Sequence, residues 1–332
     1  MLNQKEFRKA LIDELEKTGH KVKETTSMKN NGEKEGIVLL DNQSPYSPLF
    51  YFDPLYQQYL QGYPILSIIQ MMERQAKANN HILPQFPVIN ALDYSRMRAD
   101  LCICMVNTAT NGPLLEKVPH KTYGDFSAIL YWILPPDGDA RILINQKILE
   151  GINRDFDVLF ADAYANMLGR FELRNMEEVL CEMLADEMGK NADDPAITKM
   201  VHQTHAGVEM YVLTNKMHCY GASAMCYPQE MQKAADMLKG DYVIIPSSLH
   251  ELILLPFRKD QSLEVIREII HEVNQEKVSP EEQLSGEVYV YSSRAKAILR
   301  GNEYLQREQI IQEDARNREA RERSREDGRT FD

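Results

Sequence analysis

The sequence lacks long apolar runs and the short motifs that identify common enzymes. No stretch approaches the ~18 uninterrupted apolar residues that a membrane-spanning helix requires. Neither GxxxxGK[ST] nor GxGxxG occurs, which excludes the phosphate-holding loops of common nucleotide-binding folds. HExxH and GxSxG are missing too, so the most recognisable signatures of metalloproteases and serine hydrolases are excluded. We therefore expect no cofactor.

Cysteine is scarce, and its spacing fits neither a disulfide framework nor a zinc knuckle. The five cysteines are an odd number, form no CxxC pair and mostly lie in apolar runs such as 101–106. Buried, reduced thiols are the economical interpretation, and they are typical of a cytoplasmic protein. The amino terminus predicts an amphipathic helix and not a signal peptide, because it has no uninterrupted apolar core. A cytoplasmic location is the resulting expectation.

A surplus of positive charge is also missing. Lysine and arginine number 38 against 50 aspartates and glutamates, which gives a formal net charge of −12. Because an acidic surface repels phosphate backbones, we expect neither membrane association nor general nucleic-acid binding. Such a surface can meet a basic protein or imitate the charge of DNA, although its simplest role is to keep the protein in solution.

Apolar residues are sufficient for a packed core, at 43% of 332 residues. Phe7, Leu11 and Leu15 fall on one face at helical spacing, and further helical patterns cover 54–60 and 65–78. A short buried strand is predicted at 36–40. These patterns indicate a largely helical amino-terminal portion.

A helix is also predicted after residue 93. Asp93 can cap it, and Met97, Leu101 and Cys104 would follow along its length. From residue 126 onwards the pattern changes to strand pairs, each followed by a helix.

Three such hairpin–helix units are predicted. The paired strands are 126–134 with 140–145, 209–214 with 217–225, and 242–245 with 251–257. The helices that follow them are 155–168, 228–238 and 263–273. The second stops before Gly240, a standard place for a left-handed residue, and the third has Leu263, Ile266, Ile270 and Val273 on one face. The sequence therefore predicts an α+β fold of mixed or antiparallel sheets, built from repeated hairpin–helix units with helices on their faces.

The domain organisation follows from these patterns. We predict a mainly helical portion over 1–110 and a hairpin–helix portion over 111–292, either separate or joined in one unit. Near the end of the second portion, Ser279–Glu282 has the composition of a capped helix start, and a strand follows at 288–291. The rest, 293–332, is a charged tail. From Asn302 it holds seven arginines and nine acidic residues, so we expect a helix that frays near its end.

Two small groups of residues carry candidate chemistry. His202 and His205 are three apart, so on a helix they would share a face and could ligate a metal together with a third ligand from elsewhere. Ser247, Ser248, His250 and Glu251 supply the hydroxyl, imidazole and carboxylate of an acyl-transfer site.

The alternative interpretation of each group is structural. Adjacent side chains on a strand point to opposite faces, so 247–251 also fits a turn in which the serines bond to nearby backbone groups. His202 and His205 fit a polar surface or loop lining equally well. His120 and Asp125 offer one more acid–base pair, for which a loop-capping role is the favoured interpretation.

Five runs of the sequence, taken together, carry a family resemblance. They are 111–120, 211–215, 220–222, 245–251, and 273–274 with 279–285. In this order they resemble an uncharacterised family of bacterial proteins, found mainly in gut-dwelling Gram-positive bacteria and known only as a domain of unknown function. The resemblance covers about residues 5–292 and implies one folded unit. It implies no activity, cofactor or catalytic residue.

These observations rank the functional hypotheses. The leading one is a non-enzymatic cytoplasmic accessory or protein-binding protein, which meets its partner through the acidic surface or the carboxyl-terminal tail. A hydrolase-like enzyme that uses the Ser/His/Glu group at 247–251 is the alternative. An acidic, DNA-mimicking inhibitor is the third.

Overall fold

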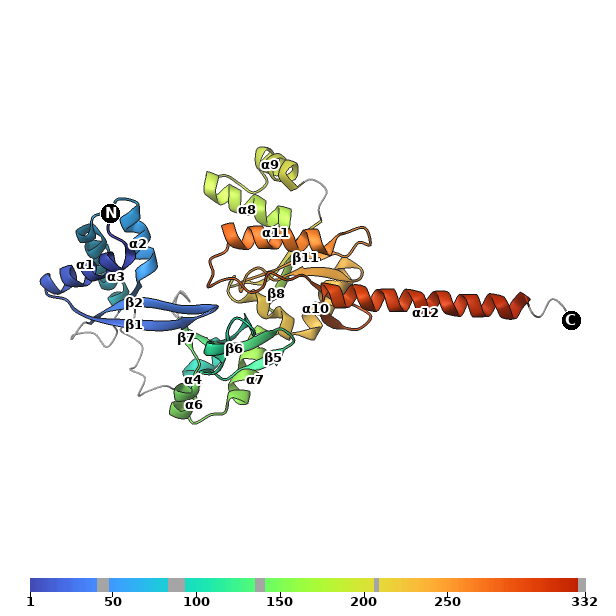
Figure 1. Ribbon diagram of the computed structural model, residues 1–332, viewed down its shortest axis with the longest axis horizontal. Coiled ribbons are helices and arrows are strands. Elements are labelled where there is room, and N and C mark those ends of the chain that lie inside the picture. Colours follow the sequence, from blue (N-terminus) through green and yellow to red (C-terminus); the bar gives the residue numbers. More distant parts are fainter. Residues whose placement is uncertain (41–47, 83–92, 135–140, 206–208, 328–332) are drawn as a thin grey trace. The chain divides into compact units, whose positions relative to one another are not determined.

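A computed structural model describes the chain except for residues 41–47, 83–92, 135–140, 206–208 and 328–332 (Figure 1). The chain divides into two units that alternate along the sequence. Unit 1 comprises 1–99, 109–119 and 144–158, and unit 2 comprises 100–108, 120–143 and 159–332. Both units contain helices and antiparallel strands, so the predicted α+β class is confirmed.

Unit 1 is built on a three-stranded antiparallel sheet in the order β1-β2-β3. Its strands are β1 (Lys21–Lys29), β2 (Gly32–Leu40) and β3 (Leu49–Tyr51). Its main helices are α1 (Gln4–Lys17), α2 (Phe52–Leu60) and α3 (Ile65–Ile82); shorter ones are α4 (Tyr94–Met97), α5 (Gly112–Leu115) and α6 (Gln146–Ile152). Strand β1 was missed by the sequence analysis, because polar residues fill it.

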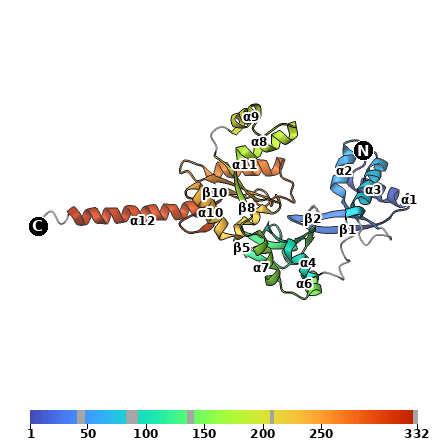
Figure 2. The ribbon, with the colours of Figure 1, turned by 180° about the vertical axis from the view of Figure 1, so that it is seen from behind.

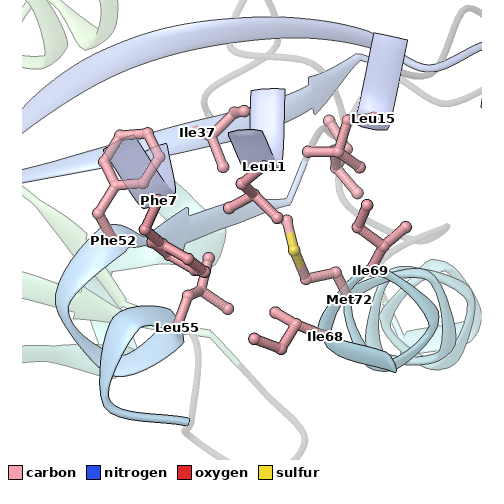
Figure 3. Close-up of a cluster of buried hydrophobic side chains, with 10 residues drawn as sticks. Phe7, Leu11, Leu15, Ile37, Phe52, Leu55, Ile68, Ile69 and Met72 are labelled. Atoms are coloured by element: carbon pink, nitrogen blue, oxygen red, sulfur yellow. The ribbon is translucent and has the colours of Figure 1, made fainter. Parts of the chain in front are cut away.

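The core of unit 1 lies between these helices and the sheet. Phe7, Leu11 and Leu15 of α1 are fully buried, which confirms the face predicted from their spacing. Figure 3 shows them pointing toward Ile37 of β2 and toward apolar side chains of α2 and α3. Burial of side chains of this size contributes ~1.5–3 kcal/mol each.

Unit 2 contains two antiparallel sheets. The smaller has the order β4-β6-β5, with β7 paired to β6. Its strands are β4 (Leu101–Asn107), β5 (Lys121–Tyr123), β6 (Phe126–Ile133) and β7 (Arg141–Leu143). The larger has the order β13-β12-β10-β11-β9-β8. Its strands are β8 (Phe171–Asn175), β9 (Tyr211–Asn215), β10 (Tyr242–Ile245), β11 (Leu252–Pro256), β12 (Tyr289–Ser292) and β13 (Ala297–Arg300).

Helices cover both faces of the larger sheet (Figures 1 and 2). On one face α11 (Leu263–Glu276) packs its apolar side against residues such as Val243 and Val290. On the other face lies α10 (Pro228–Leu238), where the Tyr242 hydroxyl donates to the Met231 carbonyl at 2.9 Å. The neighbouring residues Tyr242 and Val243 of β10 thus pack on opposite faces, because successive side chains of a strand point to opposite sides of the sheet.

The remaining helices of unit 2 are α7 (Phe156–Met167), which begins in unit 1, the pair α8 (Met176–Met188) and α9 (Pro195–His205), and α12 (Gly301–Asp327). Helix α12 follows directly on β13 and is anchored by Tyr304, whose hydroxyl donates to Asp241 Oδ2 at 2.7 Å. The part of the chain that was assigned to the tail is helical from Gly301, as predicted, whereas Ala297–Arg300 form a strand of the larger sheet; the predicted frayed end lies outside the described residues. Within the described parts, no helix is long and apolar enough to cross a membrane.

Two of the three predicted hairpins are confirmed, and one is wrong. Strands β6 and β7 pair, and so do β10 and β11. Residues 217–225 form no strand, because β9 pairs with β8 and β11 instead. The Asn215 side chain turns the chain by donating to the Cys219 carbonyl, and the buried residues Gly221–Cys226 then form a 3-10 helix.

The helix predicted after Asp93 is also wrong beyond its first turn. Asp93 does cap α4, but this helix ends at Met97. Residues Leu101–Asn107 pair with β6 as a strand. Six consecutive residues of this strand are buried on both sides, so the run is apolar throughout and shows no strand periodicity.

Three smaller predictions need correction. Ser279 starts a turn and not a helix, since its carbonyl accepts the amides of Glu282 and Gln283. The left-handed residue that ends α10 is Lys239 (φ 62°), one position before Gly240. On α11 the buried face continues through Asn274, whereas Val273 is 40% exposed.

Candidate functional site

The segment around His250 lies between two other stretches of unit 2. On one side, the amides of Gly221 and Ala222 donate to the carbonyls of His250 and Leu249 at 2.9 and 3.2 Å. On the other side, three backbone bonds join 246–249 to 282–285. We call residues 214–222, 246–250 and 282–285 the loop cluster.

The loop cluster unites four of the five runs that carry the family resemblance. Side chains complete it: Thr214 Oγ1 donates to the His250 carbonyl at 2.8 Å, and Asn274 Nδ2 donates to the Ser285 carbonyl at 3.2 Å. Gly221 is needed because a Cβ there would lie 2.3 Å from the His250 carbonyl oxygen. Runs that are far apart in the sequence therefore form one hydrogen-bonded assembly.

The His250 imidazole is held inside this assembly. Its Nδ1 accepts the Tyr220 amide at 3.3 Å, and its Nε2 lies 3.8 Å from Glu282 Oε1. The ring stacks on Tyr220 at 5.6 Å, and Tyr220 stacks in turn on Tyr131. Burial lowers the pKa of His250, against the opposing effect of Glu251 and Glu282, so the neutral ring is favoured at neutral pH.

The predicted serines make the contacts of a turn. Both are buried, and Ser248 Oγ accepts the backbone amide of His250 at 3.0 Å. Within the described parts of the chain, no hydrogen bond links Ser247, Ser248 or Glu251 to the imidazole. The structure thus brings the four residues into one loop without a nucleophile–base contact, and a catalytic role for them stays a prediction.

The two candidate metal ligands lie on α9. His202 is exposed and lies 3.5 Å from Glu177 Oε1, while the side chain of His205 lies outside the described residues. Among the side chains that the structure does describe, no three His, Cys, Asp or Glu residues converge as a metal site would need. A metal at His202 and His205 stays a prediction.

A second region of unit 2 contains a cavity of about 330 Å³. We call it the Asp125 pocket. Its walls come from the β5–β6 turn, the start of α10, strands β12 and β13, and the first turn of α12. Four aromatic rings line it, those of Tyr123, Phe126, Tyr289 and Tyr291.

The β5–β6 turn brings Asp125 to the pocket. Tyr123 pairs with Phe126, so Gly124 and Asp125 form a two-residue connection. Gly124 has a φ of 60°, the conformation that a type II′ turn requires at its first central position and that glycine adopts without strain. The Asp125 carbonyl accepts the amide of Thr108 at 2.9 Å, which fixes the turn against the end of β4.

The Asp125 carboxylate is held by residues from β12 and β13. Arg300 Nε and Nη2 donate to Asp125 Oδ2 and Oδ1, each at 2.6 Å, and the Tyr289 hydroxyl donates to Oδ2 at 2.8 Å. The hydrogen bond from Arg300, with a smaller contribution from Tyr289, lowers the pKa of Asp125. The carboxylate therefore stays ionised at neutral pH, and its oxygens accept three hydrogen bonds from other side chains of the pocket.

Two hydrogen-bond donors of the pocket remain available. Neither the Tyr123 hydroxyl nor the Lys296 ammonium has a partner among the described residues. Burial raises the pKa of Tyr123 to about 12, so this hydroxyl keeps its proton at neutral pH. Lys296 lies in the β12–β13 turn at a φ of 51°, and its side chain is exposed.

The sequence analysis named one residue of this pocket and missed the others. Asp125 was noticed beside His120, but its partners are Arg300 and Tyr289, 175 and 164 positions away. Lys296 and Arg300 fall in the part of the chain that was assigned to the charged tail. No local pattern links these residues.

Comparison with known proteins gives a family and no further relative. No curated protein and no solved structure matches the chain. The profile of a family of unknown function, DUF5688, matches residues 4–293, close to the 5–292 expected from the five runs. The chain therefore belongs to the family of unknown function DUF5688.

Proposed function

We propose that this protein is a non-enzymatic, cytoplasmic binding protein and that the Asp125 pocket is its recognition site. The observation that carries the proposal is the combination of four aromatic walls with two hydrogen-bonding groups, on Tyr123 and Lys296, that have no partner among the described residues. Ligand sites are typically apolar cavities with a few well-placed polar groups. The volume of about 330 Å³ is near the lower end of the ~300–1,000 Å³ usual for such sites.

Binding fits the pocket better than catalysis does. The carboxylate of Asp125 accepts three hydrogen bonds and is paired with a guanidinium, so it is a poor general base. The Tyr123 hydroxyl keeps its proton, which suits a donor more than a nucleophile. The Tyr123 hydroxyl can therefore orient a ligand without reacting with it.

A pocket-filling variant tests this proposal. Ala297 lines the cavity, so Ala297→Trp should place an indole in it. Ala295→Trp is the matched control, because Ala295 is exposed in the β12–β13 turn, two residues before Ala297, and is not part of the lining. A fragment library would be screened by ligand-observed NMR against wild type and both variants, with circular dichroism as the check on folding.

We expect fragments that bind wild type and Ala295→Trp but lose binding to Ala297→Trp. Fragments that bind Ala297→Trp as well as wild type would place recognition elsewhere and refute the proposal. A library that yields no binder to wild type would also count against it.

A further inference from the structure

We infer that the Asp125 pocket recognises a small carboxylate with an apolar, preferably aromatic, body. This inference rests on the proposed function and adds the chemical class of the ligand. It follows from the charges of the lining, the direction of the available hydrogen bonds and the nature of the walls.

The charged residues of the lining are two cations and two anions: Lys296, Arg300, Asp125 and Glu303. Arg300 feels the charge of both acids but, among the described residues, is paired with Asp125 alone. It forms the two-bond pair with Asp125, and the nearby Glu303 carboxylate further favours its charged form. The cation left without a described carboxylate is Lys296. An anionic ligand group would restore its pairing.

The Lys296 ammonium and the Tyr123 hydroxyl are donors. An ammonium can only donate, and the protonated Tyr123 hydroxyl has its proton to offer. Acceptor oxygens on the ligand would satisfy both groups. Hydrogen bonds to a charged partner contribute more to affinity than those between neutral groups.

A single negative charge fits better than a double one. One unpaired ammonium can balance a carboxylate, whereas a phosphate near two negative charges would also meet repulsion from Asp125 and Glu303. An amine is disfavoured because the oxygens of Asp125 already accept three bonds, and because the charge of the Glu303 carboxylate is partly balanced by the Arg300 guanidinium. The carboxylate is therefore the class that the lining favours.

The body of the ligand faces aromatic and thioether groups. Phe126 and Tyr289 lie with their ring centroids 5.1 Å apart at an angle of 50°, and Met225 and Met231 complete the wall. A planar ring can stack on or pack edgewise against such walls. The small cavity limits the ligand to one or two rings.

Four probes that share a phenyl ring and differ in their polar group test the inference. They are 3-phenylpropanoate, 3-phenylpropanamide, 3-phenylpropylamine and phenyl phosphate, titrated at pH 7 and low salt by NMR. The carboxylate should bind at least about tenfold more tightly than the amide, as one charge-assisted hydrogen bond implies. The phosphate and the amine should bind more weakly than the carboxylate.

Two variants assign this preference to residues. Lys296→Gln should bring the carboxylate and the amide to within about twofold of each other, since the ammonium is gone. Lys239→Gln is the matched control, because Lys239 is also exposed and left-handed (φ 62°) but lies outside the pocket, and it should keep the preference. Tyr123→Phe retains the ring and should weaken carboxylate binding by about threefold.

The outcomes separate this inference from the proposed function. Tightest binding of the amine or the phosphate would overturn the carboxylate assignment while leaving the pocket as a binding site. An undiminished preference in Lys296→Gln would overturn it too. If none of the four probes binds, the assignment fails, and the proposed function is then decided by the pocket-filling screen alone.

Discussion

The loop cluster and the Asp125 pocket are both rich in polar residues, but they use them in opposite ways. In the loop cluster, hydroxyls, amides and the His250 ring bond to backbone groups of the neighbouring segments. In the pocket, Asp125 and Arg300 satisfy each other, and Lys296 and Tyr123 stay available. A cluster of residue types that often catalyse reactions is therefore a weaker sign of function than donors or acceptors that the fold leaves without a partner.

The largest effect expected from this difference is that of Gly221→Ala. The added Cβ would lie 2.3 Å from the His250 carbonyl oxygen and 2.5 Å from Thr214 Oγ1. Both neighbours are fixed by hydrogen bonds and cannot move aside cheaply. We expect a loss of about 3 kcal/mol in the free energy of unfolding, the upper part of the range for overpacking. Urea unfolding followed by circular dichroism would measure it.

Gly112→Ala is the control for the generic effect of this exchange. A Cβ at Gly112 meets no atom within 4 Å, and this residue has no left-handed backbone. Its stability should change by less than about 1 kcal/mol. Equal stability of Gly221→Ala and wild type would show that the loop cluster tolerates rearrangement.

Asn215→Ala should cost about 2 kcal/mol, the next largest effect. The side chain is 1% exposed; its Oδ1 accepts the Met217 amide at 3.0 Å, and its Nδ2 donates to the Cys219 carbonyl at 2.7 Å. Removing it leaves two partly buried backbone groups without this partner, and the cost per group is at the lower end of the ~1–3 kcal/mol for a fully buried one. Trp132, the one tryptophan of the chain, lies in β6 and reports on unit 2 by fluorescence. The exposed Asn191 offers the control, and Asn191→Ala should lie within about 0.5 kcal/mol of wild type.

The elements with a clear local pattern were the ones that sequence could predict. The face of α1 follows from helical spacing, and the β10–β11 hairpin follows from two apolar runs around Pro246 and the serines. Helices α7, α10 and α11 follow from the same kind of periodicity. Each of these signals lies within about 15 neighbouring residues, where chain geometry alone determines which side chains share a face.

The missed features depend on residues far apart in the sequence. Strand β4 is buried on both sides, so its apolar run shows no alternation of apolar and polar residues. The helix cap at Asp93, just before it, therefore led to the wrong prediction of a helix. The partners of Asp125 lie on β12 and β13, and only the fold brings them to the β5–β6 turn. No contact among the described residues tests the predicted protein partner or the DNA-mimic hypothesis. Both stay predictions.

The acid sensitivity of the loop cluster is a smaller effect, and it has a defined sign. Because burial lowers the folded-state pKa of His250, the unfolded chain binds the proton more readily. This residue's contribution to stability is complete above the unfolded pKa of ~6.5 and is lost as the pH falls through the folded value. Urea unfolding between pH 7.5 and 5 should therefore show a decline that His250→Gln removes.

Glu282→Gln sharpens this prediction. The Glu282 carboxylate favours the protonated imidazole, so its removal should lower the pKa of His250 further and steepen the decline. A pH dependence that is identical in wild type, His250→Gln and Glu282→Gln would mean that the ring is solvated and that the loop cluster is less closed than its contacts indicate.

The smallest effect on stability should come from the pocket itself. Asp125→Asn removes the carboxylate of a pair in which the Arg300 side chain is 52% exposed, so we expect a loss of about 1 kcal/mol or less. Since the folded-state pKa of Asp125 is lowered, the pair stabilises the protein above the ordinary value of ~3.9, and its contribution is lost as the pH falls through the folded value. The difference between wild type and Asp125→Asn should therefore shrink in acid. A double-mutant cycle with Arg300→Met, measured by urea unfolding at pH 7 and pH 3.5, isolates the pair. A binding site that leaves its groups free for a ligand contributes little to the stability of the fold. If Asp125→Asn lost as much free energy of unfolding as Gly221→Ala, the pair would instead be a structural element like the loop cluster.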